Sequence, residues 1–287
     1  MLPSRFEYHR PGSVEEALGM LGDLEDAKVL AGGQSLIPVL KLRFAAPAHL
    51  VDINRIPGLG DITEADGALR IGALVRHNQM ASSGTVSGGY PLLAAAAQQI
   101  ADPLVRNLGS VGGSLAHADP AGDWGAVMLA AGASVVLTSS RGERTMPVSE
   151  FLIDVFTTAL EPDELLTEVR VPTPPPRSSG TYLKLERKVG DFATVAAAVQ
   201  VERSNGKIGR AGIALTGVGP KNIHATDAES SLSGAEPTEE AFAEAGRLAA
   251  AAASPVADVR GSVEYKRHMV EVFVRRGLTT AAAAAAA

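Results

Sequence analysis

The sequence predicts an α+β protein, and three features of the chain support this class. Twice in the N-terminal half, a glycine-rich segment follows a strand or helix signal and precedes an apolar, helix-like run. A run rich in proline, 172–176, then separates this half from the remainder. Beyond the prolines, predicted strands come first and two helices follow. That order favours helices packed on a small antiparallel sheet.

The first predicted helix, 14–21, starts at a capping box, because Ser13 is followed three residues later by Glu16. Asp102-Pro103 predicts a helix stop. Apolar runs and turn residues predict the other elements of this half: strands 28–30, 49–53, 69–72, 134–138, 144–146 and 164–171, and helices 36–43, near residue 78, and 91–101.

Beyond the prolines, strands 195–201 and 208–215 are predicted to form a hairpin across Asn205-Gly206. Helices are predicted at 239–253 and 263–276. The last seven residues are all alanine and indicate no function.

The composition excludes several classes of function. The net charge of -6 and a pI of about 5.6 disfavour nucleic acid as a partner. The apolar runs are too short for a transmembrane segment. The N-terminus does not have the pattern of a signal peptide, so we expect a cytoplasmic protein. The chain has no cysteine, which excludes disulfides, a thiol nucleophile and cysteine-bound iron–sulfur clusters within it. No nucleophile–base arrangement stands out, and we predict no catalytic residue.

The two glycine-rich segments are the candidate binding elements. We call 31–35 the first glycine motif and 109–114 the second glycine motif. Glycine lets the backbone approach a ligand closely, and the N–H groups at the start of a helix favour an anion. Neither motif has the G-x-G-x-x-G or Walker A pattern, so Rossmann and P-loop sites are excluded. From the residues alone, phosphate binding and ordinary turns both stay open.

These motifs resemble a known family. The sequence Ala31-Gly32-Gly33-Gln34-Ser35-Leu36, together with Arg106 to Leu115 and Asp119 to Asp123, is similar to the FAD-binding medium subunit of molybdenum hydroxylases. This is the family of aerobic carbon monoxide dehydrogenase and xanthine dehydrogenase. The similarity covers nearly the whole chain, including 184–188, 190–193 and 261–267.

The resemblance implies a fold and a division into domains. The expected fold is a two-lobed FAD-binding domain of the vanillyl-alcohol-oxidase (PCMH) type, followed by a C-terminal α+β domain with an antiparallel sheet and helices. The expected boundaries are 1–55 for the first lobe, 56–176 for the second, 177–280 for the C-terminal domain and 281–287 for an alanine tail.

The resemblance also implies site residues for FAD. The two motifs would close on its pyrophosphate through Ala31, Gly32, Gly33, Gln34, Ser35 and Leu36 and through Val111, Gly112, Gly113 and Ser114. Asp123 would accept hydrogen bonds from ribityl or ribose hydroxyls, and Phe192 would lie near the isoalloxazine ring. His117 is expected to contact FAD, and we predict no metal site. Lys184 or Lys188 would face the flavin N1–C2=O edge; a solvated basic surface is the alternative.

The implied function is electron transfer as one subunit of an oxidoreductase complex. Partners would be a large molybdopterin subunit and a small [2Fe–2S] subunit, assembled as a dimer of heterotrimers, which could lie at the inner face of the membrane. A stand-alone flavin-dependent oxidoreductase and a non-catalytic scaffold are the alternatives. Gln34 stands where carbon monoxide dehydrogenases often have histidine, which weakens the case for carbon monoxide. The substrate (carbon monoxide, purine, N-heterocycle or aldehyde) and the final acceptor stay open.

Overall fold

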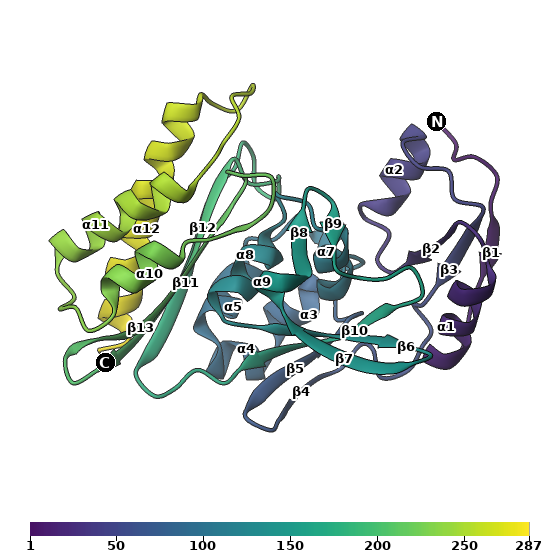
Figure 1. The fold of residues 1–287 in the computed structure, drawn as a ribbon, viewed down its shortest axis with the longest axis horizontal. Helices are drawn as coiled ribbons and strands as arrows, with labels where there is room; N and C mark the ends of the chain where they lie inside the picture. Colours follow the sequence, from purple (N-terminus) through teal and green to yellow (C-terminus); the bar gives the residue numbers. More distant parts are fainter. Residues whose placement is uncertain (287) are drawn as a thin grey trace.

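The computed structural model describes residues 1–286, with three main sheets that follow one another along its longest axis (Figure 1). The first sheet is parallel, with strand order β1-β3-β2. Its strands are β1 (Glu7–His9), β2 (Ala27–Leu30) and β3 (His49–Asp52). Helix α1 (Val14–Asp23) buries Ala17, Leu18 and Leu21 in one core with Val51. Ser13 caps this helix as predicted, accepting a hydrogen bond from the Glu16 N–H.

The second sheet is antiparallel, with strand order β4-β5-β10-β6-β7. Its strands are β4 (Ile62–Ala65), β5 (Ala68–Gly72), β6 (Ser134–Ser139), β7 (Gly142–Pro147) and β10 (Leu165–Pro172). The accompanying short elements are α3 (His77–Ser82), α4 (Gly84–Gly89), α5 (Pro91–Ala97), α6 (Pro103–Arg106), α7 (Val111–His117), α8 (Asp123–Ala130), α9 (Val148–Phe151), β8 (Leu152–Asp154) and β9 (Thr157–Thr158). Every residue of α8 is buried.

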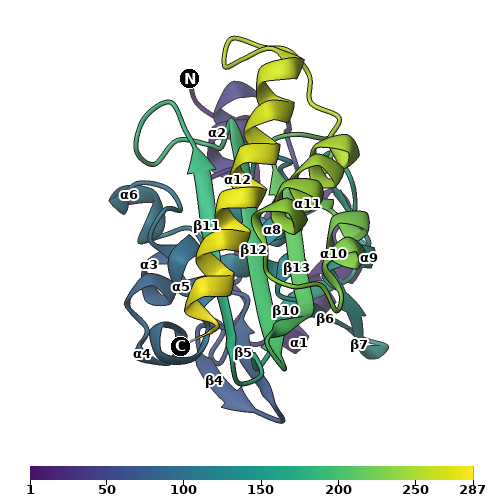
Figure 2. The same ribbon diagram turned by 90° about the vertical axis from the view of Figure 1, so that its left-hand side faces the viewer.

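The third sheet is antiparallel, and helices cover one of its faces (Figure 2). Its strands are β11 (Ser178–Leu185), β12 (Val195–Ser204), β13 (Lys207–Thr216) and β14 (Ile223–His224), and its helices are α10 (Thr226–Leu232), α11 (Glu239–Ala252) and α12 (Val263–Ala284). Strand β12 is buried on both faces: Val195 and Val199 pack in the core with these helices, while Ala196 and Ala198 pack in the core of the second sheet. A β-carbon on Gly212 would overlap Ala130 O, so β13 meets α8 backbone to backbone.

The predicted α+β class is confirmed, and several local predictions are wrong. Helix α5 ends at Ala97, before the predicted stop at Asp102-Pro103. Asp102 also starts a new helix, because it caps α6 by accepting hydrogen bonds from the N–H groups of Leu104 and Val105. Proline is favourable at the first position of a helix, because its missing N–H is not needed there. The short strands β1, β4 and β14 and the helices α4 and α10 were not predicted, nor was strand β11. Helix α12 extends beyond the predicted helix 263–276 and includes the first four terminal alanines, up to Ala284.

Three hydrophobic cores accompany the three sheets. The domain boundaries after residues 55 and 176 stay predictions. No helix within residues 1–286 has both the length and the apolarity needed to cross a membrane.

Candidate functional site

The first glycine motif connects the end of β2 to helix α2 (Leu36–Leu42). Gly33 has a φ of +71°, a conformation that residues with side chains rarely adopt. The N–H of Ile37 donates to Gly33 O at 3.0 Å and starts the helix. Within residues 1–286, the backbone N–H groups of residues 32–35 have no hydrogen-bond acceptor. Four successive N–H groups without an acceptor, at a turn from strand to helix, favour an anion.

The first motif lies in backbone contact with the start of the second. A β-carbon on Gly32 would overlap Leu108 O and would lie 2.8 Å from Gly109 Cα. A β-carbon on Gly113 would lie 3.6 Å from Ala31 Cβ. The structure therefore brings the two motifs together, although 73 or more residues separate them in the sequence. Only glycine fits at position 32 without moving one motif away from the other.

Two polar side chains that the sequence analysis missed bridge these motifs. The Asn54 side-chain amide donates to Ala31 O at 2.7 Å, and Arg76 donates to Asn54 Oδ1 at 2.5 Å. Arg76 also donates to Leu108 O at 2.6 Å. The only signal in the sequence was a polar residue, Asn54, directly after the predicted strand 49–53. The bridge fixes the separation of the motifs through hydrogen bonds to charged groups, which are stronger than neutral ones.

The second glycine motif is a helix start rather than an open loop. Helix α7 begins at Val111, and the N–H groups of Val111 and Gly112 donate to Val75 O and Ala73 O. The N–H groups of Gly113 and Ser114 are paired with the Ser110 side chain and carbonyl. These four N–H groups are therefore already paired inside the protein, and the contact of Val111, Gly112, Gly113 and Ser114 with FAD stays a prediction. The glycines instead allow close packing, since a β-carbon on Gly112 would lie 2.6 Å from Ala73 Cβ.

His77 contacts the second glycine motif at its first residue, Gly109. Its backbone N–H donates to Gly109 O at 3.1 Å, and its Nε2 lies 2.7 Å from where a β-carbon of Gly109 would be. The Trp124 Nε1–H donates to His77 Nδ1 at 3.0 Å, so the imidazole carries its proton on Nε2. Burial, followed by the nearby Arg76 and Arg106, lowers the pKa of His77 from 6.5 to about 4. The imidazole is therefore neutral at physiological pH.

The lowered pKa of His77 predicts that acid destabilises the protein. The unfolded chain binds a proton at this residue below about pH 6.5, whereas the folded chain does so only below about pH 4, so the free energy of unfolding should fall by about 3 kcal/mol across this range. Urea unfolding of the wild type and of His77→Gln at several pH values measures this. A variant whose pH dependence equals that of the wild type would contradict the prediction; the exposed His268→Gln should match the wild type.

Asp123 and Lys184, predicted separately as cofactor contacts, form an ion pair with each other. Lys184 Nζ lies 3.1 Å from Asp123 Oδ2, and the Tyr182 hydroxyl donates to Asp123 Oδ1 at 2.6 Å. The side chains of Lys184 and Asp123 are only 1% and 7% exposed. The ammonium group also donates to Gln99 O and lies 3.4 Å from Glu186 Oε2. This buried network joins β11 of the third sheet to α8, which accompanies the second sheet.

The pKa values of this network are shifted mainly by burial. Burial raises the pKa of Asp123, while the Lys184 ammonium and the Tyr182 hydroxyl oppose this shift. Burial and the neighbouring Asp123 also raise the pKa of the Tyr182 hydroxyl well above its usual value. Both oxygens of Asp123 have partners inside the protein, so the structure gives this carboxylate a role in joining the sheets in addition to the ligand contact expected for it.

The other predicted site residues lie on exposed or half-buried segments. Phe192 is 48% exposed on the loop between β11 and β12, and Arg260 donates to its carbonyl at 2.8 Å. A β-carbon on Gly190 would lie 2.8 Å from Asp102 N, so this loop rests against the start of α6. Lys188 is exposed on the same loop. His117 is half-buried, with its ring centroid 5.0 Å from that of Phe156, and burial lowers its pKa.

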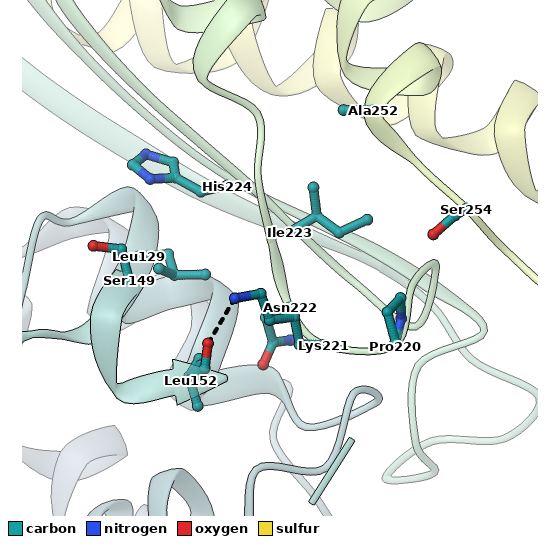
Figure 3. Close-up of a pocket in the computed structure, with 10 residues that line it drawn as sticks. All are labelled: Leu129, Ser149, Leu152, Pro220, Lys221, Asn222, Ile223, His224, Ala252 and Ser254. Carbon is teal, nitrogen blue, oxygen red and sulfur yellow. Dashed lines mark hydrogen bonds between the residues drawn. The ribbon is translucent and has the colours of Figure 1, made fainter. Parts of the chain in front are cut away.

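A separate cavity of about 310 Å³ lies between α8, α9 and the segment leading into β14 (Figure 3). Lys221 points across it and donates to Leu152 O at 2.7 Å. None of the predicted site residues lines this cavity. The glycine motifs, not this cavity, therefore define the candidate site.

The N–H groups of residues 32–35, at the close contact of the two glycine motifs, place this α+β protein in the class of proteins with a site for an anionic ligand. A family model for the FAD-binding domain of molybdopterin dehydrogenases matches residues 4–174, and one for the C-terminal domain of carbon monoxide dehydrogenase flavoproteins matches residues 180–281.

Individual relatives agree with these matches. The chain is 44% identical to the carbon monoxide dehydrogenase medium chain of Hydrogenophaga pseudoflava, over 98% of both chains. It is 41% identical to the 6-hydroxypseudooxynicotine dehydrogenase complex subunit alpha of Paenarthrobacter nicotinovorans, over 98% of this chain and 96% of the relative. A solved structure of carbon monoxide dehydrogenase from Hydrogenophaga pseudoflava superposes with a TM-score of 0.97 at 46% identity, covering 99% of each chain.

The chain belongs to the FAD-binding flavoprotein subunits of the molybdenum hydroxylases, the family to which carbon monoxide dehydrogenase medium chains belong. The predicted family, FAD as cofactor and oxidoreductase function as part of a multi-subunit complex are confirmed. The residues present fit this cofactor, because the N–H groups of 32–35 have no acceptor among residues 1–286 and Gly32 lets the two glycine motifs approach each other closely.

Proposed function

We propose that this chain links the [2Fe–2S] clusters of a small partner subunit to an external electron acceptor. Bound FAD supplies the redox chemistry for this link, because a flavin exchanges electrons with both one-electron and two-electron carriers. The observation that carries the proposal is the group of unpaired N–H donors in residues 32–35 of a chain without cysteine. The chain can hold FAD but has no thiolate for a cluster of its own.

The first glycine motif binds the negatively charged pyrophosphate in this proposal. The N–H groups of Gly32, Gly33, Gln34 and Ser35 are the donors, and Ala31 and Leu36 flank them. The Ser35 hydroxyl caps no N–H group of α2, so it is a further donor for the ligand. The second motif, 111–114, supports the first by packing rather than through its N–H groups.

The remaining predicted residues serve the flavin and the sugar in this proposal. Phe192 lies beside the ring, while Asp123 and His117 serve the ribityl or ribose part. Of the two lysines, Lys188 is exposed, and its long flexible side chain can reach a ligand, whereas Lys184 is held by Asp123. We therefore favour Lys188 for direct contact with the flavin and Lys184 for positioning Asp123.

Phe192 gives a test of the ring position. Phe192→Ala should shift the reduction potential of the flavin and change its rate of oxidation by oxygen several-fold, because the side chain would set the polarity around the ring. The FAD content should stay near that of the wild type. Spectroelectrochemistry and stopped-flow oxidation measure these properties. Val189→Ala, at a 91% exposed position on the same loop, is the matched control. An unchanged potential together with unchanged oxygen reactivity would count against this position.

The proposed partners are a large molybdopterin-containing subunit and a small [2Fe–2S] subunit, assembled as a dimer of heterotrimers. We place this assembly in the cytoplasm, with contact to the inner face of the membrane through the complex. Native mass spectrometry of the complex purified through this chain gives the composition directly. Recovery of the chain as a stand-alone enzyme that oxidises an organic substrate by itself would favour the alternative of an independent flavin oxidoreductase. Absence of a flavin spectrum would favour the scaffold alternative.

The substrate is determined outside this chain in our proposal. The two relatives named above belong to enzymes named for carbon monoxide and for 6-hydroxypseudooxynicotine, yet both align along almost the full length of this chain at 44% and 41% identity. One flavoprotein architecture therefore accompanies chemically different substrates. Oxidation assays of the whole complex with carbon monoxide, purines, N-heterocycles and aldehydes identify the substrate.

A further inference from the structure

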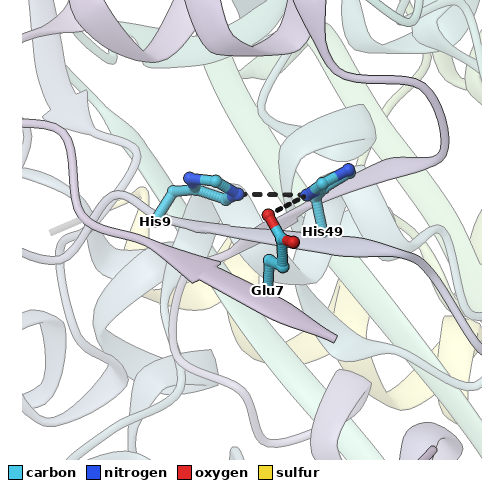
Figure 4. Close-up of side chains that lie close together, drawn as sticks. All are labelled: Glu7, His9 and His49. Carbon is cyan, nitrogen blue, oxygen red and sulfur yellow. Dashed lines mark hydrogen bonds and ion pairs between the residues drawn. The ribbon is translucent and has the colours of Figure 1, made fainter. Parts of the chain in front are cut away.

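Two histidines and one glutamate meet on the first sheet, away from the glycine motifs. Glu7 and His9 lie two residues apart on β1, so their side chains point to the same face. Glu7 is the register partner of His49 on the adjacent strand β3. Figure 4 shows the three side chains converging across the two strands. Among residues 1–286, these three form a group whose potential ligand atoms all lie within 4.8 Å of one another.

The distances match the edges of a metal coordination polyhedron. His9 Nε2 lies 3.1 Å from His49 Nδ1, and His49 Nδ1 lies 3.6 Å from Glu7 Oε2. Ligands about 2.0–2.1 Å from a tetrahedral zinc ion are separated from one another by about 3.3–3.4 Å. Both observed distances differ from this value by only a few tenths of an ångström, and the third separation, between Glu7 and His9, is within 4.8 Å. Rotation of the exposed Glu7 side chain would bring all three atoms around one ion.

The burial of the three side chains also suits a metal. The His49 side chain is 20% exposed and His9 is half-buried, so both rings are held by their surroundings, while the Glu7 side chain is 75% exposed and adjustable. Imidazole nitrogens and carboxylate oxygens are ligands of Zn²⁺ in proteins, and a water molecule would supply the fourth ligand of a tetrahedral site here. From these distances and donors, we propose that Glu7, His9 and His49 bind a divalent transition-metal ion such as Zn²⁺.

Such an ion would stabilise the pairing of strand β1 with β3 in the first sheet, the sheet whose strand β2 leads into the first glycine motif. Strand β1 has only three residues, and a strand of that length gains little from its own hydrogen bonds. Its neighbour β3 pairs on the other side with β2, which leads directly into Ala31. The ion is structural in this proposal and is independent of FAD and of the partner subunits.

The proposal is tested on the full-length chain without a histidine tag, after treatment with a chelator and dialysis. Titration with Co²⁺ should give the visible d–d bands of a tetrahedral site at one equivalent, and Zn²⁺ should remove them by displacement. Calorimetry with Zn²⁺ gives the affinity, and thermal unfolding should shift to higher temperature when Zn²⁺ is added.

The variants His9→Gln and His49→Gln should each weaken Zn²⁺ binding by at least about 100-fold, because loss of a ligand costs more than loss of its outer partner. The exposed His268→Gln is the matched control and should bind Zn²⁺ like the wild type. Glu7→Gln changes an exposed side chain and replaces the carboxylate with a neutral amide oxygen, so it should weaken binding by at least about tenfold without affecting the fold. This variant provides the test if a histidine variant does not fold. Absence of the Co²⁺ bands in the wild type, or binding that all three variants retain, would overturn the proposal and leave a simple hydrogen bond between two imidazoles.

Discussion

Replacing Gly32 with alanine should cause the purified protein to lose FAD. The added β-carbon would overlap Leu108 O and lie 2.8 Å from Gly109 Cα, both of which are backbone atoms that cannot rotate away. Forced backbone shifts of this kind cost about 1–3 kcal/mol, which corresponds to a loss of about 5- to 150-fold in affinity if the strain falls on the bound state. Flavin absorbance after gel filtration and the dissociation constant from fluorescence titration measure the effect.

The matched control is Gly19→Ala in helix α1, where an added β-carbon meets nothing within 4 Å. Alanine is favoured over glycine in a helix, so this variant should keep its FAD and unfold at the same or a slightly higher temperature. Circular dichroism shows whether Gly32→Ala is folded. A folded Gly32→Ala protein with one tightly bound FAD would contradict the role of the first glycine motif.

Replacing Lys184 with methionine should destabilise the folded chain by about 3–5 kcal/mol. The substitution leaves the buried Asp123 carboxylate without its cation, and an unpaired buried charge costs this much. Urea unfolding of the apo chain measures the change independently of FAD. Arg247→Met removes an exposed pair with Glu244 instead, and its effect should stay within about 0.5 kcal/mol.

The destabilisation by Lys184→Met should increase with pH. Burial already raises the pKa of Asp123 above its usual 3.8, and removal of the ammonium that opposes this shift raises it further. A carboxyl group with a raised pKa in the folded state contributes stability at low pH, and that stability is lost as the pH rises through the folded pKa. The difference between variant and wild type should therefore be smallest near pH 3.8 and larger at neutral pH. A difference that is constant or largest in acid would show that Asp123 is not the affected group.

The double variant Asp123→Leu with Lys184→Met separates packing from charge. Replacing both members of a buried pair with apolar residues is often close to neutral, because no unpaired charge remains. The double variant should therefore recover part of the stability lost in Lys184→Met. Equal stability of the single and double variants would indicate that the Lys184 contacts with Gln99 and Glu186 matter more than the pair itself.

The sequence by itself determined the class of the protein and most of its long elements. Helical and strand periodicities depend on residues that are close in the chain, which is why the hairpin across Asn205-Gly206 and the helices 239–253 and 263–276 could be predicted. The glycine motifs indicated the family, and the missing cysteines showed that any iron–sulfur cluster must belong to another chain. Short elements such as β1 and β4 were missed, because three or four residues carry too little periodicity.

Only the tertiary structure decided which polar groups are partners and which are free. It paired Asp123 with Lys184 across 61 residues and linked the motifs through Asn54 and Arg76. It also satisfied the N–H groups of 111–114 inside the protein and, within the described residues 1–286, left those of 32–35 without an acceptor. The physical reason is that a hydrogen-bonding group acts on a ligand only where the fold leaves it unpaired, and pairing depends on contacts between residues far apart in the chain.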